Sequence, residues 1–163
     1  MKSTFTVLRT IVYATVFFSF FTWLTLLLRS FDRSLGVCLP AGAAVPGILL
    51  MGAGGILGIT CIVLFVSRGK GTPAPFDAPK EFVVTGPYRY VRNPMYLGGL
   101  LLLAGAGLYL HSPSVLLLSL VVALIVHLFV VFYEEPTLRT KFGTSFESYC
   151  AEVRRWIPRP SAR

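Results

Sequence analysis

The chain has 163 residues, of which 55% are hydrophobic and only 13% are charged, and its mean hydropathy is +0.72. A soluble domain carries about 25% charged residues, so this composition excludes an ordinary water-soluble fold. The formal charge is +8, but the basic residues lie between hydrophobic runs, which indicates a membrane surface and not nucleic acid as their partner. The length suits one domain, residues 1–163.

Two hydrophobic runs fill the first half of the chain. Residues 10–28 are numerous enough to cross about 30 Å of hydrocarbon. Because no small-x-small cleavage site follows them, we expect a retained span and not a signal peptide. The second run, 43–66, contains Gly54 and Gly58, whose spacing is typical of closely packed membrane helices.

Residues 67–93 form a polar segment in which prolines prevent a continuous helix. Long loops of this kind are usually functional or disordered. The aromatic residues of the segment favour an ordered, functional loop; they are Phe76, Phe82, Tyr88 and Tyr90.

The second half is predicted to contain a helical hairpin and an amphipathic tail. Spans at 94–110 and 114–133 are joined by a short His-Ser-Pro turn, so they should be antiparallel. The tail, 134–163, repeats apolar residues every three or four positions, at Phe142, Phe146, Tyr149, Val153 and Trp156. This stripe would lie on the membrane or pack on the domain.

The fold class that follows is an all-α integral membrane protein with four transmembrane helices. The N-terminus, the 67–93 loop and the tail hold thirteen of the fifteen basic residues, since only Arg29 and Arg33 fall elsewhere. The positive-inside rule then predicts a multi-pass protein with both termini and its loop rim in the cytoplasm.

The stretch from Thr85 to Gly98 reads Thr-Gly-Pro-Tyr-Arg-Tyr-Val-Arg-Asn-Pro-Met-Tyr-Leu-Gly. Pro94 suits the first turn of a helix and Asn93 suits its cap. The free N–H groups of such a helix start favour an anion. The alternative is a capped helix with snorkelling arginines and interfacial tyrosines.

Glu134 and Glu135 follow the last predicted span. Two carboxylates are unfavourable at a helix C-terminus, so we expect a cation beside them, either Arg89, Arg92 or a charged ligand. The alternative is a solvated helix end. His127, seven residues earlier, is a functional candidate at membrane depth or a neutral histidine bonded to a neighbouring helix. Three scattered cysteines indicate no metal site.

An anion-binding helix start, aromatic rings and a carboxylate pair would suit a zwitterionic cofactor with a cationic centre and an aromatic base. In this order, and followed by Glu-Glu-Pro-Thr-Leu, Phe142-Gly143 and Tyr149, the motifs resemble the isoprenylcysteine carboxyl methyltransferase family, akin to membrane phospholipid methyltransferases. The resemblance covers about residues 70–160.

The resemblance implies methyl transfer from S-adenosylmethionine at the cytosolic rim. By position, the cofactor-binding residues would be Val83, Tyr88, Arg92, Asn93, Pro94, Met95, Tyr96 and Glu134. Asn93 replaces the family's common His but still has a polar side chain. His127 or Glu135 would be the catalytic base if the substrate needs one.

The substrate expectation rests on a departure from the family. Carboxyl-methylating members carry an Arg about one turn before the acidic pair, where this chain has Val130 and its apolar neighbours. We therefore expect a lipid-like, apolar or amphipathic substrate with a neutral reacting group. The alternatives are a nicotinamide-dependent membrane reductase and a small transporter, and the sequence leaves the oligomeric state open.

Overall fold

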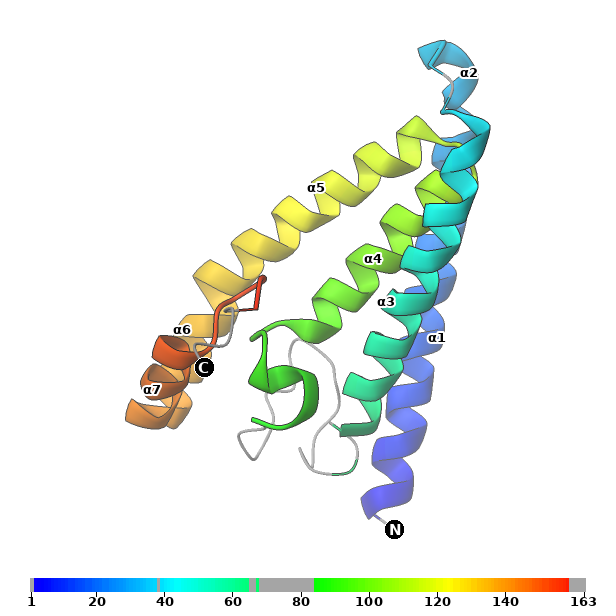
Figure 1. Ribbon diagram of the computed structural model, residues 1–163. Helices are drawn as coiled ribbons and strands as arrows, with labels where there is room; N and C mark the ends of the chain where they lie inside the picture. The colour runs from blue at the N-terminus through cyan, green and yellow to red at the C-terminus, as the bar shows by residue number, and fades with distance from the viewer. Residues whose placement is uncertain (1, 38, 65–66, 68–83, 159–163) are drawn as a thin grey trace.

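The computed structural model describes residues 2–37, 39–64, 67 and 84–158. Over this part of the chain the structure is helical and holds no β-strand (Figure 1). The helical elements are α1 (Lys2–Arg29), α2 (Asp32–Leu35), η1 (Ala41–Ala43), α3 (Ala44–Leu64), η3 (Gly86–Arg89), α4 (Pro94–Tyr109), α5 (Pro113–Phe129), the π-helical turn η4 (Val130–Glu134), α6 (Glu135–Phe142) and α7 (Thr144–Glu152).

Three helical stretches are long and apolar enough to cross a membrane, namely Ile11–Ser34, Ala41–Leu64 and Pro113–Phe142. Large apolar side chains on them face outward, among them Ile56 and Leu120, as expected for helices in contact with lipid. The fourth predicted span is the apolar helix α4, whose 16 residues rise about 24 Å. That is less than the ~30 Å hydrocarbon core, so its crossing stays a prediction.

Helices α3 and α4 are held together by direct backbone contact at glycines. A Cβ atom added to Gly54 would lie 2.6 Å from the carbonyl oxygen of Gly98, and one added to Gly98 would lie 3.0 Å from the amide nitrogen of Gly58. Higher along the pair, a Cβ on Gly105 would meet the Gly47 carbonyl oxygen at 2.7 Å. The small-residue packing predicted for Gly54 and Gly58 is therefore confirmed.

The turn between α4 and α5 makes the predicted hairpin. His111 adopts a left-handed φ of 53°, and the Ser112 hydroxyl accepts a hydrogen bond of 3.2 Å from the Val115 amide. Asp32, after α1, accepts a further bond of 3.0 Å from the Ser114 amide. From this turn α4 and α5 diverge toward the opposite end of the bundle (Figure 1).

The last long helix does not end at residue 133 as the sequence suggested. It continues from α5 through the π-helical turn Val130–Glu134 into α6. Pro136 has no N–H to donate to the carbonyl four residues earlier. A π turn just before it is one of the ways in which a helix continues past such a gap. The acidic pair thus lies within a helix, and the prediction of an unfavourable C-terminal position was wrong.

The predicted amphipathic tail packs on the domain. After Gly143, with a φ of +53°, α7 follows α6, and Phe146, Tyr149 and Val153 form a buried cluster. Leu138 on α6 packs against the same cluster, so the stripe joins the two short helices.

The glycine contact between α3 and α4 gives a stability prediction. Gly54→Ala should lower the free energy of unfolding by about 1–3 kcal/mol, because the new methyl group clashes with the Gly98 backbone. Gly52→Ala is the control, since a Cβ there meets no atom within 4 Å and alanine favours a helix. Thermal unfolding in detergent should show a lower midpoint for Gly54→Ala alone. Equal midpoints would contradict the close contact.

A second prediction concerns topology. The N-terminal end of α1 and the tail lie at the end of the bundle opposite the His111 turn (Figure 1). Reporter fusions after residue 163 and within the turn should therefore report opposite sides of the membrane, with the C-terminal fusion in the cytoplasm. A cytoplasmic signal from the turn would refute the four-span arrangement.

Candidate functional site

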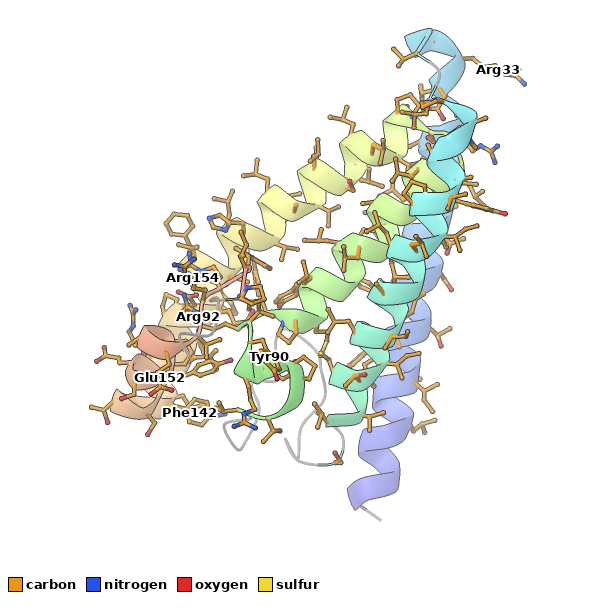
Figure 2. The ribbon with its side chains drawn as sticks, viewed as in Figure 1. Arg33, Tyr90, Arg92, Phe142, Glu152 and Arg154 are labelled. Atoms are coloured by element: carbon orange, nitrogen blue, oxygen red, sulfur yellow. The ribbon has the colours of Figure 1, made fainter. Side chains whose placement is uncertain are left out.

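The described residues predicted as a site, except His127 on α5, gather at one end of the bundle, which we call the rim. The rim consists of residues 86–96, from η3 to the first turn of α4, and 130–135, from the π turn to the start of α6. Figure 2 shows Tyr90 and Arg92 at this end, with Arg154 of the tail next to Arg92. The Arg92 amide donates a hydrogen bond of 2.9 Å to the Arg154 carbonyl. The tail therefore packs directly against the rim.

Tyr88 fixes η3 to the rest of the protein. Its side chain is buried, 9% exposed, in a cluster with Cys61 and Leu57 of α3 and Met95 of α4. Its carbonyl oxygen accepts a 2.6 Å hydrogen bond from the Tyr149 hydroxyl of α7. Burial raises the pKa of the Tyr88 phenol well above its ordinary value, so this ring stays neutral.

The start of α4 differs in one respect from the expected cap. Asn93 occupies the N-cap position and Pro94 the first turn, as predicted, but the Asn93 side chain makes no cap hydrogen bond. Its amide nitrogen instead donates to the Arg155 carbonyl at 3.3 Å. The predicted capping bond was wrong, because the tail supplies a backbone acceptor that the sequence did not place there.

Glu134 faces α4. Its Oε2 accepts a 3.0 Å hydrogen bond from the Tyr96 hydroxyl, and the residue is half-buried. Among residues 2–37, 39–64, 67 and 84–158, the ion pairs involve Glu135 and Glu147 but not Glu134. Within the described structure this carboxylate is thus balanced by a neutral phenol, which leaves its charge available to a cation.

Glu135 is arranged differently. It is 8% exposed, and Arg155 binds both of its oxygens, with Nε to Oε1 at 2.7 Å and Nη2 to Oε2 at 2.9 Å. Arg92 lies 3.3 Å from Oε1, whereas Arg89, the other expected cation, is exposed. The hydrogen bonds to Glu135 raise the pKa of Arg155 above its ordinary value. Arg155 was missed because nothing in a sequence distinguishes it from its exposed neighbour Arg154.

His127 contacts the tail. The Trp156 indole N–H donates to Nδ1 of His127 at 3.0 Å. Since Nδ1 accepts this bond, the neutral ring carries its proton on Nε2. Two interpretations of His127 were open: a functional residue at membrane depth, or a neutral histidine bonded to a neighbouring helix. The geometry is that of a bonded histidine, although its partner lies in the tail and not in a helix. Trp156 belonged to the predicted apolar stripe, and this pattern did not predict its hydrogen bond to His127.

The structure thus brings together most of the predicted cofactor-binding residues. Pro94, Met95 and Tyr96 lie in the first turn of α4, next to Asn93, and Tyr96 contacts Glu134 in the π turn. Val83 lies outside the described residues. Two further buried polar atoms, Thr85 Oγ1 beside the rim and Arg92 Nε within it, have no hydrogen-bond partner in the described structure. Buried polar groups without partners are rare, so each needs an explanation.

Comparison with known proteins adds the family. A model of the phospholipid methyltransferase family matches residues 42–145, from the start of α3 through the whole rim to α7. The chain belongs to the phospholipid methyltransferase family. Curated proteins gave no match. The resemblance in the sequence motifs is confirmed, and the family together with the apolar helices indicates methyl transfer at a membrane.

Proposed function

We propose that the protein transfers a methyl group from S-adenosylmethionine to a lipid-like substrate at the membrane surface. The observation that carries the proposal is Glu134, a half-buried carboxylate that accepts a bond from Tyr96 and has no cationic partner among the described residues. Burying a carboxylate is costly unless a cation or hydrogen bonds compensate it. A ligand with a positive centre would complete this site.

The residues of the rim fit such a cofactor. Glu134 and Tyr96 would hold its α-ammonium group, a cation that the demethylated product adenosylhomocysteine keeps. The first-turn amides of α4, at Met95 and Tyr96, would favour its carboxylate, since a helix start attracts anions. The unpartnered Thr85 Oγ1 and Arg92 Nε add polar atoms that a ligand would satisfy. Tyr88, Asn93, Pro94 and, by sequence position alone, Val83 would line the same pocket.

Bound S-adenosylmethionine would supply a methyl group on a positively charged sulfur. The protein's own part is to align a nucleophile with that group and exclude water, and alignment alone contributes a large share of the rate in such displacements. A neutral amine fits this site best: its nitrogen would bond to the methyl carbon as the carbon–sulfur bond breaks, and the neutral thioether would be the leaving group. The ammonium formed would then release its proton to water at the membrane surface.

Neither catalytic base expected from the sequence is well placed for proton removal. The guanidinium groups of Arg92 and Arg155 stabilise the deprotonated form of Glu135 and so make it a weak base. The Nδ1 lone pair of His127 accepts from Trp156, so His127 would first have to release that bond. We therefore propose a structural role for Glu135, which holds the rim together through Arg92 and Arg155. His127 would act as a hydrogen-bond donor to the substrate, through its Nε2–H.

The cofactor prediction is tested by binding. Adenosylhomocysteine should stabilise the detergent-solubilised protein by about 2.7 kcal/mol at a hundredfold excess over its Kd, and NADPH should not. Glu134→Gln should raise the Kd of adenosylhomocysteine roughly ten- to a hundredfold, because a charge-assisted hydrogen bond contributes about 1.5–3 kcal/mol. Thermal unfolding measures the stabilisation, and isothermal calorimetry measures the Kd.

The matched control is Glu147→Gln, which removes the same charge from an exposed carboxylate 3.9 Å from Arg139. Its Kd should equal that of the wild type. Stabilisation by NADPH alone would favour the reductase, and an unchanged Kd in Glu134→Gln would remove Glu134 from the cofactor site.

The substrate prediction follows from α5 and the π turn, which contain no Lys or Arg. Val130, 1% exposed, occupies the position one turn before Glu134. A desolvated substrate carboxylate would have no cation there. A radiolabelled methyl-transfer assay should therefore label a membrane lipid extract and leave a farnesylcysteine analogue nearly unlabelled. Efficient labelling of farnesylcysteine, without labelled lipid, would overturn this assignment.

A further inference from the structure

The tail between α7 and residue 158 ties the two sides of the rim together. The Arg154 carbonyl accepts from the Arg92 amide at 2.9 Å, and the Arg155 carbonyl accepts from the Asn93 side chain at 3.3 Å. One residue later, the Trp156 indole donates to His127 on α5. In Figure 1 this segment runs between the start of α4 and the helix formed by α5 and α6.

Within the tail, the contact of Arg155 with Glu135 has the most constrained geometry. Its two bonds to Glu135, at 2.7 and 2.9 Å, form a bidentate pair. Such pairs fix orientation as well as distance, because both groups are planar and matched in width. The pair is mostly buried, with side-chain exposures of 29% for Arg155 and 10% for Glu135, so water screens it less than a surface pair.

Glu135 is the residue directly after the π turn, and Glu134 is the last residue within it. A π turn is rare and holds one residue more between hydrogen-bonded groups than an α-helical turn. If the helix relaxed to regular α geometry, the register would shift by one residue, which corresponds to a rotation of about 100°. The Glu134 carboxylate would then turn away from Tyr96.

We propose that Arg155 is a positioning residue for methyl transfer: by holding Glu135, it keeps the π turn Val130–Glu134 in place and so aims the Glu134 carboxylate across the rim at the cofactor. The role in transfer rests on the proposed function, whereas the effect on the π turn does not. Arg92 is the second cation on Glu135, but it has one contact at 3.3 Å and cannot replace the bidentate grip.

The test uses the full-length protein in detergent and three variants. Arg155→Gln removes the charge and the paired donors, while Arg155→Lys keeps the charge but loses the bidentate geometry. Arg154→Gln is the matched control, since Arg154 is exposed and contacts Arg92 only through its backbone carbonyl. Two quantities are measured: hydrogen exchange of the amides of residues 130–135 without ligand, and the Kd of adenosylhomocysteine.

Arg155→Gln should speed amide exchange in the π turn and raise the Kd at least tenfold. Arg155→Lys should give intermediate values, and Arg154→Gln should match the wild type within twofold. On a Glu135→Gln background the further effect of Arg155→Gln on the Kd should disappear, since the partner is already gone. Faster exchange along all of α5 and α6 in Arg155→Gln would show a general loss of structure and would contradict a specific hold of Arg155 on the π turn.

The outcomes separate the two proposals. If the wild type does not bind adenosylhomocysteine, the proposed function fails, and amide exchange still tests the hold of Arg155 on the π turn. If the wild type binds but Arg155→Gln and Arg154→Gln have the same Kd, or if exchange at residues 130–135 is unchanged in Arg155→Gln, Arg155 is not a positioning residue.

Discussion

The rim depends on the burial of two adjacent carboxylates on one membrane helix. Charged groups at this position are expensive unless each has a partner. Glu135 receives two guanidinium groups, and the tail that carries one of them also contacts Asn93 and His127. Glu134 accepts a hydrogen bond from the phenol of Tyr96. Much of the local architecture, from the π turn to the return of the tail, serves to provide these partners.

The two carboxylates divide their roles because their partners differ. A carboxylate held by two cations is electrostatically complete and stabilises structure, whereas one held by a neutral donor still attracts a positive ligand. Adjacent residues on a helix point in different directions, so Glu135 reaches the tail while Glu134 reaches α4. The membrane methyltransferase family of the chain is consistent with a cationic ligand at Glu134.

Local patterns in the sequence predicted the hairpin, the helix start at Pro94 and close helix packing at Gly54 and Gly58, because each depends on neighbouring residues or on a short repeat. The continuation of α5 past Pro136 was not predictable, since a proline reads as a stop unless a π turn precedes it. The partners of Glu135 were only half predictable. Arg92 lies in a motif, but Arg155 is 20 residues away and is selected by tertiary packing.

The short length of α4 has a consequence for access to the site. Helices α1, α3 and the α5–α6 stretch are long enough for the hydrocarbon core, but α4 rises only about 24 Å. If α4 crosses the bilayer, a mismatch of about 6 Å must be met by thinning of the adjacent leaflet or by sinking of η3 below the headgroup plane. Either adjustment brings Tyr96 and the lipid headgroups to a similar depth, so the lipid-like substrate that we propose would reach the rim by lateral diffusion, without leaving its leaflet.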